Sequence, residues 1–186
     1  KHVANAEAHV AFWNITHPDD LHRVDLGPIP AAVFSHPQIA AVGMTESEAV
    51  DRGVDHVIGR RDYGGTAYGW ALADETSFAK VIVDRATGLV IGAHIIGPQA
   101  APLIQPLIQG MRFGQTAREL AEAVYYIHPA LTEVVENALL DASHGARAPR
   151  RVRIKKNGTH TRQTTRARAA PSPCGRSSAG SSSWRR

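Results

Sequence analysis

The chain has 186 residues, a length that suits one ordinary domain with additional segments. Its single cysteine, Cys174, excludes a disulfide framework, and its apolar runs are too short for a membrane-spanning helix. No apolar signal segment follows Lys1, so we expect a cytoplasmic protein in a reducing compartment.

The charge divides the chain into two unlike parts. Residues 1–142 hold 9 Lys and Arg against 17 Asp and Glu, a net charge of −8, whereas residues 143–186 hold 12 basic and no acidic side chains. The second part is rich in Arg, Ser, Ala and Pro and cannot bury enough apolar surface to offset the entropy cost of ordering. We therefore expect a disordered basic tail over 143–186.

The basic tail has two interpretations. The favoured one is a solvated or accidental extension, such as a shifted reading frame, because the composition changes abruptly after Ala142. The less favoured one is nucleic-acid binding through phosphate contacts, for which the tail contains neither a zinc-ligand pattern nor an RNA-recognition signature.

The acidic part opens with a predicted helix over residues 1–16. One apolar stripe recurs there at helical spacing, formed by Val3, Ala6, Val10 and Trp13. The next stretch, HPDDLHRVDLGPIP, is punctuated by proline and glycine and is interpreted as a linker.

Strand and helix signals follow the linker. The stretch AAVFSHPQIAAVGM predicts a strand over 31–34, a break at His36–Pro37 and a resumed strand after the break. Thr45 with Glu48 three residues later is the capping-box pattern that begins a helix, and Gly53 can end that helix.

The clearest β signal is a predicted hairpin over 77–97. Segments rich in Val and Ile flank the turn residues Asp84–Gly88. Before this hairpin, DHVIGRRDY predicts another strand, and GGTAYGWALADET is expected to be irregular because Gly64, Gly65 and Gly69 break any period.

Helices are predicted for the rest of the acidic part. The stretch PQAAPLIQPLIQGMRFG carries an apolar helical stripe, but Pro106 removes a backbone hydrogen bond at a cost of about 3 kcal/mol inside a helix. We therefore expect a kink or a late helix start there. Thr116 with Glu119 is a second capping box, and a last helix is predicted after His128.

This order of elements predicts an α+β fold, an antiparallel β-sheet covered by helices. The chain contains no GxGxxG, P-loop or CxxC motif, which argues against a doubly wound nucleotide-binding fold. If the chain belongs to an enzyme, the machinery that binds a dinucleotide cofactor is absent from these residues.

The last predicted helix lies in the stretch IHPALTEVVENALL. Proline disfavours the helical region for the residue before it, so His128 is expected outside the helix and Pro129 at the first helical position. Glu133 lies close to the helix start. A buried stripe is predicted from Leu131, Val134, Val135, Ala138 and Leu139.

The spacing of His128 and Glu133 leaves two interpretations open. A carboxylate near a helix start gains about 0.3–1 kcal/mol from the helix dipole, which is a purely structural reason for Glu133 and the one that spacing alone favours. Alternatively, Glu133 holds one imidazole nitrogen of His128, fixes its tautomer and stabilises the imidazolium, so that the other nitrogen moves a proton.

The other candidate residues are assigned structural roles. His36, in SHPQ, marks a strand break, and His94, in GAHIIG, is expected to be a hydrogen-bonded core histidine. Trp70, Tyr125 and Tyr126 are expected to pack or to lie at an interface, and the alternative for the two tyrosines is the lining of a substrate cleft. No HxH or HxxxH spacing beside carboxylates occurs, so no metal site is expected.

Several separated motifs resemble the flavin disulfide reductases, the pyridine nucleotide-disulfide oxidoreductase family that includes glutathione reductase and dihydrolipoamide dehydrogenase. HPALTEVVENALL is similar to their C-terminal signature, VFSHPQIAAVGMTESEA to the opening of their dimerisation domain, and GLVIGAHIIG to its central hairpin. DYGGTAYGWA, LIQPLIQGM and IHPALTEVVENALL resemble the mycothione reductase branch most closely. The match covers about residues 1–142.

The resemblance implies a division of the chain into three segments. Residues 1–22 correspond to a remnant helix of the FAD-binding domain, where Lys1–Val3 match the start of a helix near the flavin. Residues 23–142 correspond to the dimerisation domain, and residues 143–186 form the disordered Arg/Ser-rich tail without a counterpart in the family.

The resemblance also implies a mechanism. In such a homodimer, NADPH reduces FAD, FAD reduces a CxxxxC disulfide, and the resulting thiolate attacks a low-molecular-weight, mycothione-like disulfide. His128 matches the histidine that one subunit supplies to the other's active site, and Glu133 matches the glutamate that orients it. The chemistry needs such a group because a thiolate leaves a disulfide poorly unless it is protonated or stabilised. His128 and Pro129 are implied to lie near the partner's FAD, joined by a cis bond.

The chain departs from the family pattern because the redox CxxxxC and both dinucleotide fingerprints are absent, and Cys174 is no substitute. We therefore expect a C-terminal part of an NADPH-dependent FAD disulfide reductase that binds neither cofactor alone and is inactive by itself. One alternative is a non-catalytic dimerisation module, in which His128→Ala would change nothing measurable. The other is a nucleic-acid-binding protein, whose salt-dependent DNA binding would vanish when 143–186 are deleted.

Overall fold

The computed structural model describes residues 1–146, and residues 147–186 lie outside the described part. The strands are β1 (Pro30–Val33), β2 (Ile39–Gly43), β3 (His56–Asp62), β4 (Phe78–Asp84) and β5 (Val90–Ile96). The helices are α1 (His2–Thr16), α2 (Glu46–Asp51), α3 (Ala67–Ala71), α4 (Ala100–Leu103), α5 (Gln105–Arg112), α6 (Ala117–Glu122) and α7 (Thr132–Gly145), with a 3₁₀ turn, η1, at Tyr63–Gly65.

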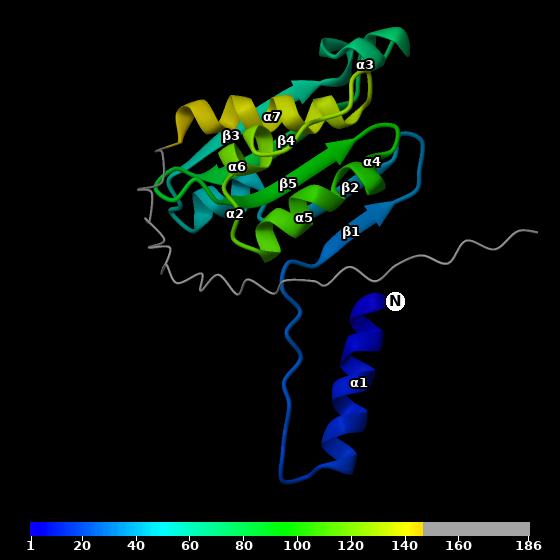
Figure 1. The fold of residues 1–186 in the computed structure, drawn as a ribbon, viewed down its shortest axis with the longest axis vertical. Coiled ribbons are helices and arrows are strands. Elements are labelled where there is room, and N and C mark those ends of the chain that lie inside the picture. Colours follow the sequence, from blue (N-terminus) through cyan, green and yellow to red (C-terminus); the bar gives the residue numbers. More distant parts are fainter. Residues whose placement is uncertain (147–186) are drawn as a thin grey trace, which may run out of the picture. The chain divides into compact units, whose positions relative to one another are not determined.

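One antiparallel sheet organises the strands, in the order β1-β2-β5-β4-β3 (Figure 1). The central hairpin, β4 and β5, is the one that the sequence predicts. Its turn is closed by the Asp84 carboxylate, which accepts hydrogen bonds from the backbone N and the hydroxyl of Thr87 at 2.7 and 2.8 Å. Gly88 supplies the positive φ of +75° that the turn requires. The prediction of an α+β fold with an antiparallel sheet is confirmed.

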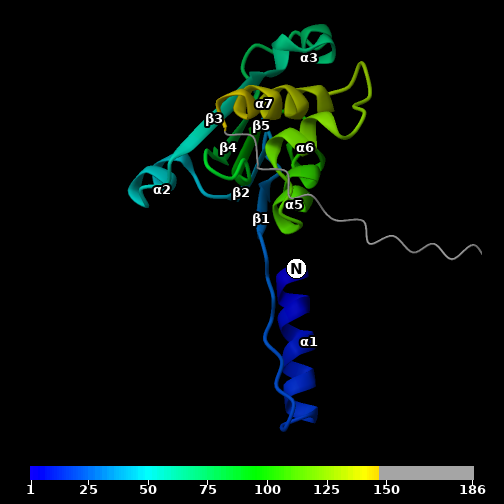
Figure 2. The same cartoon turned by 60° about the vertical axis from the view of Figure 1, so that its left-hand side comes forward.

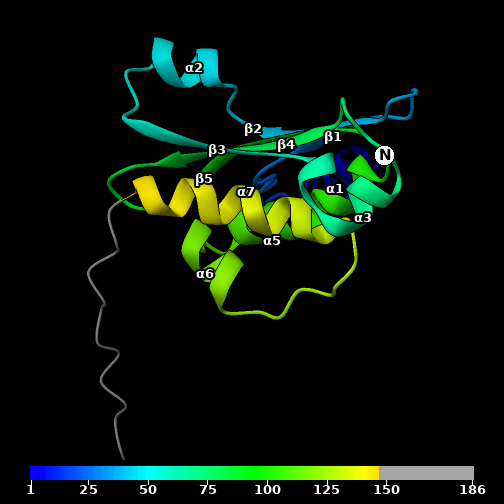
Figure 3. The ribbon, with the colours of Figure 1, turned by 90° about the horizontal axis from the view of Figure 1, so that it is seen from above.

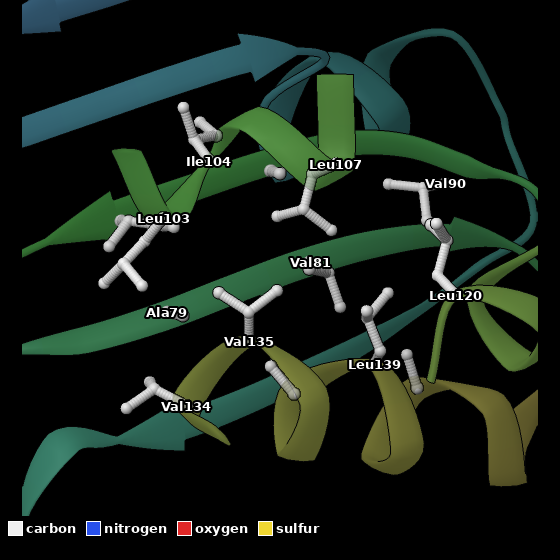
Figure 4. Packing of buried hydrophobic residues seen from close by; sticks show 14 of the residues in the cluster. Ala79, Val81, Val90, Leu103, Ile104, Leu107, Leu120, Val134, Val135 and Leu139 are labelled. Atoms are coloured by element: carbon white, nitrogen blue, oxygen red, sulfur yellow. The ribbon is translucent and has the colours of Figure 1, made fainter. Parts of the chain in front are cut away.

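Helices α5, α6 and α7 cover one face of the sheet, and α2 lies on the other side (Figure 3). The predicted stripe of α7 is buried, and Figure 4 shows Val135 and Leu139 directed toward the strand that carries Ala79 and Val81. Each fully buried Val or Leu side chain contributes roughly 1.5–3 kcal/mol relative to its exposed state. This apolar contact between helix and sheet is part of the core, to which α4, α5 and α6 also contribute.

Helix α7 lies beside β3 and β4 (Figure 2). It can approach β3 closely because Gly59 has no side chain. A Cβ atom at Gly59 would lie 2.0 Å from the carbonyl oxygen of Ala138. Nearby, the Asp141 carboxylate accepts a hydrogen bond from the backbone N of Arg60 at 3.0 Å. The Arg85 guanidinium donates to the carbonyl oxygen of the last residue of α7 at 2.8 Å. The helix is therefore fixed along its length, and this fixes its first turn.

Helix α1 has the half-buried stripe that its sequence predicts, without a fully buried residue. At its end the Trp13 indole lies between two imidazole rings, 3.8 Å from the centroid of His17 and 4.7 Å from that of His22. The indole N–H donates to the carbonyl oxygen of Asp20 at 2.9 Å. These contacts fold the start of the predicted linker back onto the end of the helix.

The segment 64–76 is more regular than its glycines suggest, because it contains part of η1 and all of α3. The Thr66 hydroxyl caps α3 by accepting a hydrogen bond from the backbone N of Gly69 at 3.3 Å. Gly69 is needed for packing, since a Cβ there would lie 1.9 Å from the carbonyl oxygen of Tyr63. The prediction of an irregular segment is wrong because this glycine permits a close backbone contact and does not interrupt the helix.

The proline in the predicted helix over 98–114 has the expected effect. The segment forms two helices, α4 and α5, and Ile104 lies between them. Pro106 occupies the first turn of α5, where its missing N–H removes no helical hydrogen bond. The prediction of a kink or a late helix start is confirmed.

Helix α7 begins at Thr132, three residues after the position that the sequence predicts. The placement of Pro129 at the first helical position is therefore wrong. A turn precedes the helix, in which the backbone N of Glu133 donates to Ala130 at 3.2 Å and that of Val134 donates to Leu131 at 3.0 Å. The expected position of His128 outside the helix is confirmed.

The tail predicted over 143–186 falls mostly outside the described residues. Within them, Ser143–Gly145 belong to the last turn of α7.

Candidate functional site

His128 lies on the connection between α6 and α7, formed by residues 123–131. This connection turns several apolar side chains toward solvent, including Val124 and Ile127, the latter 75% exposed. The His128 side chain is 69% exposed, so its ring does not belong to the core. The His128–Pro129 peptide bond is cis, as is His36–Pro37.

The structure brings His128 and Glu133 together. The Nδ1 atom of His128 lies 2.8 Å from Oε1 of Glu133, a carboxylate whose side chain is only 18% exposed. The other carboxylate oxygen accepts a hydrogen bond from the backbone N of Ala130 at 3.3 Å. The hydrogen bond with His128, helped by the bond from Ala130, holds the pKa of Glu133 below its ordinary value of 4.5 against the opposing effect of burial.

The arrangement determines which imidazole nitrogen is available. An ionised carboxylate can only accept hydrogen bonds. Nδ1 of His128 therefore carries a hydrogen and donates a hydrogen bond to Glu133. In the neutral ring, Nε2 is then the nitrogen without a hydrogen and can accept a proton. In the protonated ring, Nε2 carries a hydrogen and is a second donor. A solvent-facing Nε2 on a ring fixed through Nδ1 can accept or deliver a proton.

Helix α7 explains why the Glu133 carboxylate lies where it does. Glu133 is in the first turn of α7, where the partial positive charge of the helix N-terminus stabilises a carboxylate. The Asn137 side-chain amide donates to the carbonyl oxygen of Glu133 at 2.6 Å. The structural and functional reasons for Glu133 are therefore compatible, because the same carboxylate stabilises the helix start and holds the imidazole.

The other histidines of interest have different surroundings. The ring of His94 is half-buried, and its Nε2 is 2.9 Å from the carbonyl oxygen of Met44, which confirms the expected hydrogen bond. His36 is exposed and lines an open cavity of about 420 Å³ together with Asp74 and Ser77. Asp74 directs its carboxylate to the backbone N of Ser77 and not to the histidine.

The aromatic residues near the site differ from one another. Tyr125 is fully exposed at 105%, and Trp70 is also largely exposed. Tyr126 instead turns inward and its hydroxyl donates to the carbonyl oxygen of Leu120 at 3.0 Å. Burial, with a smaller effect from the charge of Glu136, raises the pKa of Tyr126 to about 12. Apart from its position two residues before His128, nothing in the sequence separates Tyr126 from Tyr125.

Among residues 1–146, no three His, Cys, Asp or Glu side chains are grouped so that they could hold a metal ion. Within the same residues, no helix combines the length and apolar character that crossing a bilayer requires. Cys174 lies outside the described part of the chain.

Known proteins are similar to this chain in sequence and in fold. Residues 29–139 match the family model of the pyridine nucleotide-disulphide oxidoreductase dimerisation domain. The chain is 53% identical over 144 residues to mycothione reductase of Mycobacterium tuberculosis, covering 75% of this chain and 31% of that protein. It is 37% identical over 138 residues to dihydrolipoyl dehydrogenase of Geobacillus stearothermophilus, covering 74% of this chain and 28% of that protein.

Solved structures share the fold of this chain. LpdA from Mycobacterium tuberculosis matches with a TM-score of 0.61 and 26% identity, over 70% of this chain and 28% of that chain. The HOCl-induced flavoprotein disulfide reductase RclA from Escherichia coli, at 22% identity, shares the fold with a TM-score of 0.61 over 73% of this chain and 30% of its own.

The chain thus spans less than a third of the curated relatives that it matches, 31% of the mycothione reductase and 28% of the dihydrolipoyl dehydrogenase. The family model covers more than half of the 186 residues, from 29 to 139. The chain therefore belongs to the pyridine nucleotide-disulphide oxidoreductase family and contains its dimerisation domain, as its motifs predicted.

Proposed function

We propose that this chain is the dimerisation part of a flavin-dependent disulfide reductase of the mycothione reductase type. In this role His128 and Glu133 form an acid–base pair that serves the active site of a partner subunit. The observation that carries the proposal is the exposed imidazole of His128 held through Nδ1, 2.8 Å from the carboxylate of Glu133.

The proposed chemistry is a proton transfer at sulfur. When a thiolate of the partner's dithiol attacks a substrate disulfide, a new S–S bond forms and the old one breaks. The leaving thiolate takes a proton from Nε2 of the His128 imidazolium, which gives a free thiol and a neutral ring. Glu133 stabilises the cationic ring before the transfer and keeps Nε2 directed outward after it.

The surroundings of His128 support a partner at this position. Val124 and Ile127 precede His128 on the same connection and face solvent. Exposed large apolar side chains that cluster commonly mark an interaction surface. We propose that a second copy of the subunit covers them, so that the functional unit is a homodimer.

FAD and NADPH enter the proposal through the family. No GxGxxG fingerprint occurs in the sequence, and His128 and Pro129 lie on an exposed connection. The proposal therefore places both cofactors in a complete reductase, with His128 and Pro129 near the FAD of the partner. The isolated chain is expected to bind neither cofactor and to have no reductase activity.

The proposed substrate is a low-molecular-weight, mycothione-like disulfide, because the mycothione reductase of Mycobacterium tuberculosis is 53% identical over the aligned residues. The proposed location is the cytoplasm. We also propose the division that the sequence motifs imply, with residues 1–22 as part of the FAD-binding domain and residues 23–142 as the dimerisation domain.

A chimera tests the proposal. Residues 1–142 of this chain would replace the aligned part of the Mycobacterium tuberculosis mycothione reductase, and NADPH-dependent reduction of mycothione would be followed. We expect an active chimera in which His128→Gln lowers kcat by roughly 10²–10⁴-fold, the contribution of general acid–base catalysis. His36→Gln is the matched control, because this histidine also precedes a proline, and it should leave kcat unchanged.

Two outcomes would contradict the proposal. An active chimera that tolerates His128→Gln would identify a dimerisation module without a catalytic role. NADPH-dependent disulfide reduction by the purified 186-residue chain would show that the expected inactivity of the chain alone is wrong.

A further inference from the structure

The connection that carries His128 has few contacts of its own. Within the described part of the chain, no hydrogen bond joins the backbone of residues 124–129 to another backbone group. From Glu122 to Pro129 every residue is exposed except Tyr126, which is half-buried. The position of His128 must therefore depend on side-chain contacts.

Tyr126 makes the contact at the α6 end of this connection. Its hydroxyl donates to the carbonyl oxygen of Leu120, 3.0 Å away, near the end of α6. The last carbonyl groups of a helix lack helical partners, so the hydroxyl satisfies a group that would otherwise need another donor. Burial of the ring and, to a smaller extent, the charge of Glu136 raise the pKa of Tyr126 to about 12, so the hydroxyl stays protonated and remains a donor.

The α7 end of the connection is held by Glu133. Its carboxylate accepts hydrogen bonds from the backbone N of Ala130, at 3.3 Å, and from His128, at 2.8 Å. His128 thus lies between two fixed points, the phenol of Tyr126 two residues before it and the amide of Ala130 two residues after it. If the first point were released, the connection could move while α6 and α7 stayed in place.

We infer that Tyr126 is a positioning residue for His128. Its hydroxyl holds the connection so that the imidazole meets the Glu133 carboxylate, and it acts through the backbone without touching the reacting atoms. This inference rests on the proposed function, because the position of the ring matters only if Nε2 transfers a proton. Tyr125, the adjacent phenol, is fully exposed and provides no such anchor.

Histidine nitrogen chemical shifts in the full 186-residue chain test the inference. ¹⁵N-labelled histidine distinguishes the Nδ1–H from the Nε2–H tautomer at a pH above neutrality, where an imidazole is uncharged. The His128 signals are identified by their loss in His128→Gln. Three variants are compared with the wild-type chain: Tyr126→Phe, which keeps the ring and removes the hydroxyl, Tyr125→Phe as the matched control, and Glu133→Gln.

The expected result is an Nδ1–H signature for His128 in the wild-type chain and in Tyr125→Phe, and its loss in Glu133→Gln. Tyr126→Phe should shift the signature toward that of a free imidazole, with a roughly two- to tenfold larger population in which the bond to Glu133 is open, as the loss of one hydrogen bond implies. The circular dichroism of Tyr126→Phe should match that of the wild-type chain, since the ring is retained.

The outcomes separate the inference from the proposed function. If the wild-type chain itself shows a free imidazole and Glu133→Gln changes nothing, the His128–Glu133 pair fails and the proposed function fails with it. If the pair is present but Tyr126→Phe behaves like Tyr125→Phe, only the inference about Tyr126 is overturned.

Discussion

His36 and His128 allow a comparison within one molecule. Each precedes a proline in an exposed segment. His36 lines an open cavity together with Asp74, and His128 lies beside Glu133. The Glu133 carboxylate is bonded to the imidazole, whereas Asp74 uses one oxygen, Oδ1, to accept hydrogen bonds from the backbone N atoms of Thr76 and Ser77. The two regions therefore share a His–Pro pair but differ in their chemistry.

The difference shows that a histidine before a proline is not by itself a site. The carboxylate must come from an element that directs it to the ring. For His128 this element is α7, whose first turn carries Glu133 and whose middle is packed on β3 at Gly59. In the region of His36, the Asp74 carboxylate stabilises its own turn. Burial raises the pKa of Asp74, but the hydrogen bonds from Ser77 and Thr76 outweigh burial and hold that pKa below its ordinary value.

After the loss expected for His128→Gln, the largest expected effect concerns the carboxylates. In the chimera, Glu133→Gln should lower kcat by about 10²-fold, the lower end of what general acid–base catalysis contributes, because the imidazole remains but is no longer oriented. Asp74→Asn is the matched variant and should leave kcat unchanged, although it weakens a turn. Steady-state kinetics with mycothione would check both. Equal losses in the two variants would mean that the carboxylates act through folding alone.

The next effect concerns the packing that places α7. Gly59→Ala should lower the free energy of unfolding by about 3 kcal/mol, the upper end for overpacking, because a Cβ at Gly59 would meet backbone atoms of α7 at 2.0 and 2.6 Å. Urea unfolding of the chain measures this change. The same variant should also disturb the ¹⁵N signature of His128, since α7 carries Glu133.

Gly53→Ala serves as the control for Gly59→Ala. A Cβ at Gly53 meets nothing within 4 Å, but the residue has a positive φ of +65°. We expect a loss of roughly 1–2 kcal/mol from backbone strain and no change at His128. If Gly59→Ala cost no more than Gly53→Ala, the close contact between β3 and α7 would not be what fixes the helix.

The smallest effect is a pH dependence of stability. The pKa of Glu133 is lowered in the folded chain, so its contribution is complete above the ordinary value of 4.5 and is lost as the pH falls through the folded value. Glu133→Gln should therefore lower the free energy of unfolding at pH 7 by at most about 1 kcal/mol, as for surface ion pairs, and this difference should shrink in acid.

A double-mutant cycle checks the origin of that pH dependence. Urea unfolding would be measured between pH 7 and about pH 3 for Glu133→Gln, His128→Gln and the double variant. Because the hydrogen bond with His128 is the largest cause of the lowered pKa, the effect of Glu133→Gln should be weaker without His128. If Glu133→Gln had the same effect with and without His128, the lowered pKa of Glu133 would come from the helix start alone.

Local signals predicted many elements of the fold correctly. Both capping boxes form, with the backbone N of Thr45 bonded to Glu48 at 2.8 Å and that of Thr116 to Glu119 at 2.9 Å. These contacts span three residues, so the sequence contains both partners. The same holds for the turn at Asp84, where the carboxylate and its donors are neighbours in the chain.

Predictions were wrong where a residue acts on a distant part of the chain or where two local arrangements compete. Gly69 was expected to interrupt any helix, but it lies within α3 and lets the backbone of this helix approach the backbone of Tyr63. Pro129 looked like the first residue of a helix, but the Glu133 carboxylate binds the backbone N of Ala130 in a turn that delays the helix to Thr132. The inward position of Tyr126 could not be predicted, since Tyr125 has the same side chain.

The sequence by itself determined the order of the elements, the hairpin, the helix caps and the presence of a histidine and a glutamate five residues apart, because each depends on near neighbours. Only the tertiary structure decided that α7 packs on β3, that the His128 side chain is exposed and that the Tyr126 hydroxyl bonds the carbonyl oxygen of Leu120. These features depend on which side chains meet across the sheet and between helices, where the free energy of burial selects among arrangements that the local sequence permits.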